Sequence, residues 1–130
     1  MILRDIIYTV YGGNTSELEK ITGYNQTTLS KYLLSPSKRA EKKILDALVD
    51  MADPYQRAYI YQMLVNTVSK HMKKTEIFDT LSKRTGLHYR TLSGYYYNMR
   101  MPRKSANRVM YELYKLANEV QKTHNKKNST

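Results

Sequence analysis

The sequence predicts an all-α protein whose helices, about eight in number, form two tandem copies of one unit. Apolar residues recur at spacings of three and four along most of the chain, which is the period of an amphipathic helix. The segment LEKITGYNQTTLSKY (18–32) matches LSKRTGLHYRTLSGY (81–95) at eight of fifteen positions, with a constant offset of 63 residues. No segment alternates apolar and polar residues with period two, so no strand is expected.

The first unit, residues 1–53, is expected to begin with an amphipathic helix. Its apolar residues are spaced to share one face: Ile2, Leu3, Ile6, Ile7 and Val10. The glycines that follow end this helix. A second helix is expected to open at Ser16, because Glu19 three residues later completes the pattern of a capping box. Gly23 should end it, since a left-handed backbone costs glycine little.

Two further helices complete the first unit. Asn25 predicts the N-cap of a third helix that reaches about Leu34. After Ser35-Pro36 a fourth helix is expected. Its buried residues share one face: Ala40, Ile44, Leu45, Leu48 and Met51.

The second unit, residues 54–121, repeats this order of helices. Asp53 and Pro54 have the pattern of an N-cap followed by a proline in the first turn, which opens a long helix. The helices of this unit are expected at about 55–72, from a cap at Thr75 to Thr85, at about 89–97, and from Pro102 onward. Residues 122–130 are expected to form a basic, disordered tail. The two units are expected to pack as one compact body or two closely docked ones, because about 60 residues alone bury little core.

The net charge of +11 is unevenly distributed. Residues 1–53 contain seven lysines and arginines and seven acidic residues, whereas residues 54–130 contain fifteen and four. The whole excess therefore lies in the second half. A polyanion is the natural partner of such a surface, because each neutralised phosphate releases condensed counterions.

Catalytic and metal-binding chemistry has little support in the sequence. There are no cysteines, and His71, His88 and His124 are scattered without neighbours at metal-ligand spacing. Phosphate-binding glycine loops and nucleophile elbows are missing. We therefore expect a protein that is not an enzyme and uses no cofactor. The chain has no long apolar run and no leader-like start, which predicts a cytoplasmic, nucleoid-associated protein without a membrane span.

The repeat has the form of two short helices joined by a glycine-containing turn. Apolar residues hold corresponding inner positions in the two copies: Leu18, Tyr24, Leu29 and Tyr32, then Leu81, Leu87, Leu92 and Tyr95. Two helices that cross steeply need such inner faces, and Gly23 and Gly86 suit the turn. The polar outer face of the second helix is then free to enter the major groove of DNA.

This pattern resembles the helix-turn-helix of the phage-repressor-like (Cro/C1-type) regulators. The matching residues are Leu18, Thr22, Gly23, Leu29, Ser30 and Tyr32 in the first copy, and Leu81, Thr85, Gly86, Leu87, Leu92, Ser93 and Tyr95 in the second. The resemblance implies a compact helical bundle that reads operator DNA through the helix after the turn. One position departs from the family pattern. Where alanine is usual and the helices lie closest, this chain has Glu19 and Ser82.

The resemblance also implies which residues read bases. By position they are Gln26, Thr27 and Lys31 in the first unit, and Tyr89 and Arg90 in the second. Glutamine can pair with adenine and arginine with guanine through two hydrogen bonds, so Gln26 and Arg90 are the leading candidates. The competing interpretation is that these residues form an ordinary solvated helix surface.

Phosphate contacts are expected from the loops that flank the recognition helices. The candidates are Ser35, Lys38, Arg39, Lys42 and Lys43 in the first unit, and Arg100, Arg103, Lys104 and Arg108 in the second.

Three functional interpretations remain open for a chain that binds double-stranded DNA. In the first, it is a transcriptional regulator, such as a repressor, whose two units read two adjacent major-groove half-sites. In the second, it is an architectural or partition protein that coats DNA with little sequence preference. Alternatively, the neutral first unit docks a protein and only the second unit holds DNA. Each of these is compatible with a homodimer or higher assembly on DNA.

Overall fold

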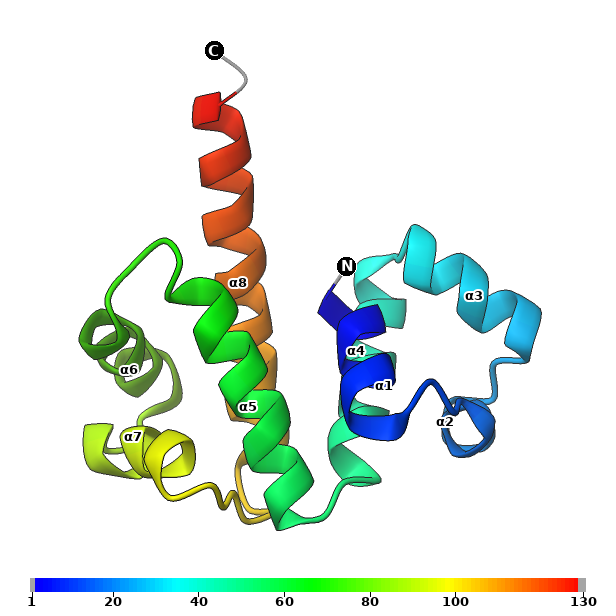
Figure 1. The fold of residues 1–130 in the computed structure, drawn as a ribbon, viewed down its shortest axis with the longest axis horizontal. Coiled ribbons are helices and arrows are strands. Elements are labelled where there is room, and N and C mark those ends of the chain that lie inside the picture. The colour runs from blue at the N-terminus through cyan, green and yellow to red at the C-terminus, as the bar shows by residue number, and fades with distance from the viewer. Residues whose placement is uncertain (1, 129–130) are drawn as a thin grey trace.

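The computed structural model describes the backbone of residues 2–128 and the side chains of residues 2–123. This part of the chain is entirely helical and contains no strand, which confirms the all-α prediction (Figure 1). The helices are α1 (Ile2–Tyr11), α2 (Ser16–Thr22), α3 (Gln26–Leu34), α4 (Lys38–Asp50), α5 (Pro54–Val68), α6 (Lys74–Thr85), α7 (Tyr89–Tyr97) and α8 (Ala106–Asn128).

Local sequence signals account for several of the helix ends. Gly23 and Gly86 adopt φ values of 75° and 76° at the ends of α2 and α6, a left-handed conformation that suits glycine. Asn25 caps α3 by accepting a hydrogen bond from a backbone N–H, as predicted. Asp53 caps α5 in a full capping box, with Pro54 in the first turn, and this prediction is also confirmed.

The predicted capping box at Ser16 is wrong. Thr15 is the N-cap of α2, and Ser16 is already helical, its backbone N–H donating to the side chain of Asn14. Glu19 turns to the hydroxyl of Thr15, which donates to its carboxylate over 3.1 Å. The prediction is wrong by one residue. Thr15, directly before Ser16, also has a hydroxyl side chain, and it occupies the N-cap position.

The second unit departs from expectation at three helix boundaries. The helix α5 ends at Val68 rather than near Met72, and α6 begins at Lys74, so Thr75 lies inside it. The last helix begins at Ala106 rather than at Pro102. Ser105 just before it has a left-handed φ of 66°.

The start of α8 is delayed by contacts of the preceding loop. Met101 is fully buried, and its backbone N–H donates to the carbonyl of Pro54 over 3.0 Å, which holds the loop in a non-helical path. At its other end α8 continues to Asn128, through most of the segment expected to be a disordered tail. No glycine or proline interrupts residues 106–128, so nothing local ends the helix earlier.

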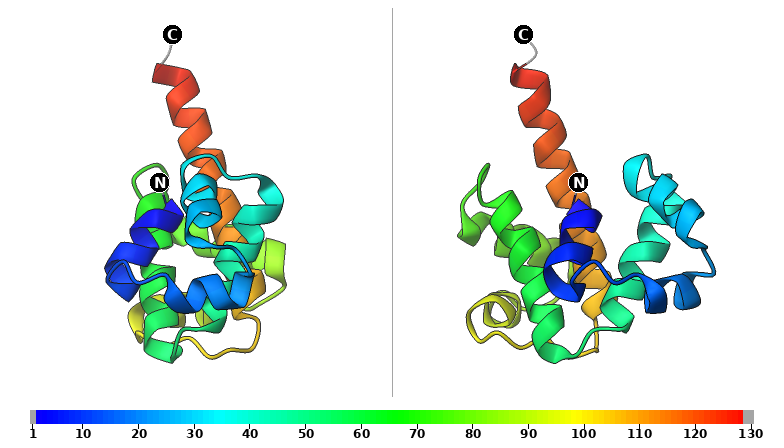
Figure 2. Two further views of the ribbon diagram at one scale, coloured as in Figure 1. Left: turned by 90° about the vertical axis from the view of Figure 1, so that its right-hand side faces the viewer. Right: turned by 45° about the vertical axis from the view of Figure 1, so that its right-hand side comes forward.

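The helices pack around one continuous hydrophobic core that draws on both units. The helices α5 and α8 lie at the centre, with α6 and α7 on one side and α2 and α3 on the other (Figure 1). The C-terminal part of α8 extends beyond the body of the protein in both further views (Figure 2). Within residues 2–128, no helix combines the length and apolar character needed to cross a membrane.

The two units pack against each other through equivalent helices. By their order in the repeat, α1 corresponds to α5 and α4 corresponds to α8. The main contacts between the units are α1 against α5 and α4 against α8. Equivalent elements meet in this way across the isologous interface of a two-fold dimer. The chain therefore has the internal arrangement of a dimer whose two unlike protomers are joined covalently.

A buried arginine connects the two units at their junction. Arg57 in α5 is 6% exposed and donates to two backbone carbonyls, that of Ala52 after α4 and that of Met101 before α8. A buried cation needs such partners, because an unpaired charge in the interior is very costly. Arg57 thus fixes the α7–α8 loop against the linker between the units.

Candidate nucleic-acid interface

The elbow of the second unit is closed by side-chain hydrogen bonds. The hydroxyl of Thr85 donates to the carbonyl of Leu81 and accepts from the N–H of Leu87. The hydroxyl of Ser82 crosses the turn and donates to the carbonyl of Leu87 over 2.6 Å. Because α6 and α7 also pack directly against each other, α7, the predicted recognition helix of this unit, is firmly positioned.

The elbow of the first unit keeps only part of this arrangement. Thr22 makes the same two hydrogen bonds, to Leu18 and from Tyr24. Glu19 stands at the position of Ser82 in the second unit. Its carboxylate does not cross the turn but accepts a hydrogen bond from the hydroxyl of Thr15, in the loop between α1 and α2. The α2–α3 pair is not among the main helix contacts. The glutamate at the position where the family pattern has alanine therefore coincides with the looser of the two elbows.

The outer face of α7 lines an open groove with a volume of about 330 Å³. Its lining contains two arginines and no acidic residue: Arg90, Thr91, Gly94, Tyr95, Asn98 and Arg100. Arg90 and Arg100 are exposed, and neither makes an ion pair within the described part of the chain. The side chain of His88 caps α7 by accepting from the N–H of Arg90, which fixes the start of this helix.

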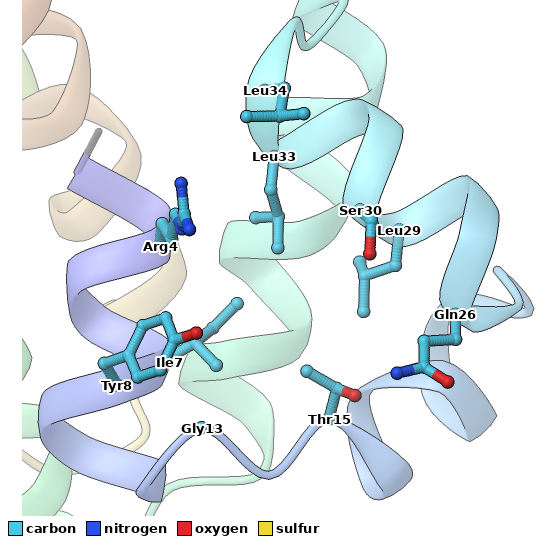
Figure 3. Close-up of a pocket in the computed structure, with 10 residues that line it drawn as sticks. All are labelled: Arg4, Ile7, Tyr8, Gly13, Thr15, Gln26, Leu29, Ser30, Leu33 and Leu34. Atoms are coloured by element: carbon cyan, nitrogen blue, oxygen red, sulfur yellow. The ribbon is translucent and has the colours of Figure 1, made fainter.

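The other expected base readers lie in different surroundings. Tyr89 is half-buried, with its ring edge-on to Phe78 at 5.7 Å between centroids. Thr27 and Lys31 are exposed on α3. Gln26 is exposed as well, but it lines a cleft between α1 and α3, and its amide points toward Thr15 (Figure 3). Arg90, Thr27 and Lys31 are thus the predicted readers that are exposed and free of such packing, and Arg90 is the one that lies in the groove on α7.

The expected phosphate-binding residues divide into free and engaged groups. Exposed residues without a side-chain partner among the described residues are Ser35, Lys38, Arg39, Arg100 and Lys104. The others have partners within the chain. Lys42 pairs with Asp46, Lys43 lies over the ring of Tyr24, Arg103 pairs with Asp50, and Arg108 donates weakly to the carbonyl of Arg84.

Basic residues recur at equivalent places after the two recognition helices. When the fourth helices of the two units are aligned with an offset of 65 residues, Lys38 falls on Arg103, Arg39 on Lys104 and Lys43 on Arg108. Each unit therefore has basic residues at equivalent sequence positions after α3 or α7: Lys38 and Arg39 open α4, whereas Arg103 and Lys104 lie in the loop before α8.

Sequence reasoning missed Thr91 and Asn98 as members of the α7 groove. A signal for Asn98 was present, because residues 90, 94 and 98 are spaced by four and share one helix face. Asn98 is the C-cap of α7, and it was overlooked because the helix was expected to end just before it.

The helices α3 and α7, which the sequence predicts as recognition helices, lie on opposite sides of the central α5–α8 pair (Figure 1). Among the side chains that the structure describes, no three histidine, cysteine or acidic residues gather in a way that could hold a metal ion. No protein-family description, curated protein or solved structure matches this chain.

Proposed function

We propose that this chain binds double-stranded DNA and reads sequence chiefly through α7. The observation that carries the proposal is the groove on α7, where two exposed arginines flank the face of a capped helix without an acidic neighbour. An arginine at the start of such a helix can pair with the two acceptor atoms of guanine in the major groove. Arg100 at the far end of the groove is suited to a phosphate.

The charge distribution supports the same assignment. The second unit holds the whole positive excess, and its α7–α8 loop adds Lys104 and Arg103 to the arginines of the groove. The first unit is neutral overall, and its Gln26 faces a cleft in the protein. We therefore propose that α7 makes the dominant contact and α3 a weaker one, as in an asymmetric dimer of a transcriptional regulator.

Selection of bound duplexes from a random DNA pool tests this proposal. A regulator that uses both helices should enrich a long consensus with two unlike half-sites about 10 bp apart. A short consensus would leave α7 as the sole reader and the first unit as a docking module. Strong binding without any consensus would favour a protein that coats DNA.

A salt titration tests the electrostatic part of the proposal. If about 6–8 phosphates are neutralised, log affinity should fall against log salt with a slope of about −5 to −7. Replacing Arg100, Lys104 and Arg108 together by glutamine should flatten this slope by about 2–3. A control with the same net charge replaces Lys70, Lys83 and Lys122, which lie outside the proposed interface, and should change the slope by less than about 1. A slope near zero for the wild-type chain would contradict DNA as the partner.

A further inference from the structure

A cleft in the first unit separates α1 from α3 and encloses about 250 Å³ (Figure 3). Its apolar wall consists of Ile7 on α1 and Leu29 and Leu33 on α3. Thr15 and Gln26 close its lower end in the figure, and the hydroxyl of Ser30 lies on the α3 side. The cleft thus lies directly behind a recognition helix.

The corresponding place in the second unit is filled by aromatic rings. Phe78 on α6 is 1% exposed and lies at the centre of the cluster. Three rings of α7 surround it edge-on, with centroids 5.7 Å away for Tyr89, 6.2 Å for Tyr96 and 6.4 Å for Tyr97. The hydroxyl of Tyr96 also donates to the side chain of Asn66 on α5, which joins α5 to α7.

The repeat relates the cleft to this cluster residue by residue. Subtracting the constant offset of 63 places the four aromatic residues at positions 15, 26, 33 and 34. These positions hold Thr15, Gln26, Leu33 and Leu34, and all four line the cleft. The cleft is therefore lined at the four positions that carry rings in the other copy, and the ring is replaced by a smaller polar side chain at two of them, Thr15 and Gln26.

The polar groups of the cleft favour an anion. Arg4 on α1 lines the cleft opposite Leu33 and Leu34, and it is exposed (Figure 3). Within the described residues its guanidinium makes no ion pair, and the cleft lining contains no acidic side chain. A guanidinium binds a carboxylate well because both are planar and can share two parallel hydrogen bonds.

We propose that this cleft binds a small aromatic carboxylate with a single ring. The ring takes the place of the missing aromatic side chains against Ile7, Leu29 and Leu33, and the carboxylate pairs with Arg4. The volume suits this class, since drug-sized ligands occupy about 300–1,000 Å³ and a single ring needs less. This site is independent of DNA, so it stands or falls separately from the proposed function.

Amide chemical shifts of the full chain in the absence of DNA provide the test. Benzoate should shift residues of α1 and α3 with a dissociation constant of about 1 mM or tighter. Benzyl alcohol, which has the ring without the charge, should bind about tenfold more weakly. Acetate, which has the charge without the ring, should leave these amides unchanged at the same concentrations.

Two variants separate the ring from the charge. Arg4→Gln should weaken benzoate binding about tenfold and leave benzyl alcohol binding unchanged, whereas Lys20→Gln, an equal charge change on the exposed face of α2, should alter neither. Thr15→Phe restores the ring that the second unit carries and should abolish binding of both aromatic probes. If that variant does not fold, Leu33→Tyr tests the same filling from α3.

The proposal is overturned by either of two results. One is the absence of shifts in α1 and α3 with benzoate at about ten times the expected dissociation constant. The other is benzoate binding that persists undiminished in a folded ring-filling variant, because the probe would then occupy another part of the surface.

Discussion

The two units share a backbone pattern but stabilise α3 and α7, the proposed recognition helices, by different means. In the second unit α7 is held by a cluster of rings around Phe78 and by the hydroxyl of Ser82 across the turn. In the first unit, α3 lies beside a cleft, and Glu19 makes no such bridge. The residues that are identical in the two copies set the turn. The residues that differ decide how firmly the second helix is held.

This difference parallels the distribution of charge. The unit with the tightly packed recognition helix also carries the positive excess and the arginine-lined groove. A recognition helix that must present a side chain to one base pair benefits from a rigid base, since positional error weakens a two-bond contact. The looser unit is better suited to a weaker or adjustable contact. Four predictions test how far this contrast extends.

The largest effect is expected at the centre of the aromatic cluster. Phe78→Ala removes a ring that is 1% exposed and should lower the free energy of unfolding by about 3–5 kcal/mol, since the three surrounding tyrosines cannot collapse fully into the space. Thr15→Ala at the equivalent position should cost less, about 0.5–1 kcal/mol, because it removes no ring and loses only the hydrogen bond of the N-cap hydroxyl to Glu19. Urea denaturation followed by circular dichroism measures both. Equal losses would show that the two units are packed alike.

The second effect concerns DNA recognition. Arg90→Ala should weaken binding to a selected duplex by about 1–3 kcal/mol and relax the preference at one base pair. Thr27 occupies the same place on α3, and Thr27→Ala should cost well under half as much because the first unit makes the weaker contact. Fluorescence anisotropy with the selected duplex and single-base variants compares them. A larger loss for Thr27→Ala would reverse the assignment of the dominant helix.

The sequence was sufficient to predict the helices that carry strong local signals. The caps at Asn25 and Asp53 and the two glycine turns depend on residues close in sequence, and the structure agrees with them. The buried face of the fourth helix is confirmed except at Met51, which is half-buried and follows the helix as its C-cap. The delayed start of α8 could not be predicted in this way. It depends on the contact of Met101 with Pro54, which are 47 positions apart.

The candidate site was predictable only in part for the same reason. The repeat predicted Arg90 and Tyr89 as neighbouring base readers on one helix, but it could not show that Arg90 is exposed whereas the ring of Tyr89 turns inward to Phe78. Nor could it separate the free Lys104 from Arg103, which pairs with Asp50 of the other unit. The cleft could not be predicted from the sequence alone. Once the aromatic cluster of the second copy is known, the lack of aromatic residues at the matching positions of the first copy indicates where the cleft lies.

A smaller effect is expected at the elbow itself. Ser82→Ala removes the hydrogen bond to the carbonyl of Leu87 and should cost about 0.5–1.5 kcal/mol of unfolding free energy. Glu19→Ala, at the matching position, should cost less, because the hydrogen bond of Glu19 is to Thr15 and does not cross the turn. Thermal unfolding compares the two. If Glu19→Ala is the more damaging change, the glutamate supports the first elbow in a way that its hydrogen bond does not reveal.

The smallest effect is a loss of stability at high pH. The hydroxyl of Tyr61 on α5 donates to the carbonyl of Leu92 over 2.8 Å, and burial strongly raises the pKa of this fully buried tyrosine, with a further increase from Tyr95. Tyr11 in the first unit donates to Leu48 in a similar way, and burial raises its pKa to about 12. In both cases the folded state keeps its proton where the unfolded state loses it.

The sign and size of this effect follow from linkage. With an unfolded pKa near 10, the contribution of Tyr61 to stability is complete well below pH 10 and declines as the pH rises above it, by about 0.7 kcal/mol between pH 9.5 and 10.5. Tyr61→Phe should be less stable at neutral pH, because Leu92 loses its donor, but its stability should fall less steeply across this window. Tyr55→Phe, at an exposed tyrosine of the same helix, should keep the wild-type slope. Urea denaturation at closely spaced pH values measures these slopes. An unchanged slope for Tyr61→Phe would mean that Tyr61 ionises as readily in the folded protein as in the unfolded chain, and that the inner face of α7 is wetter than its packing indicates.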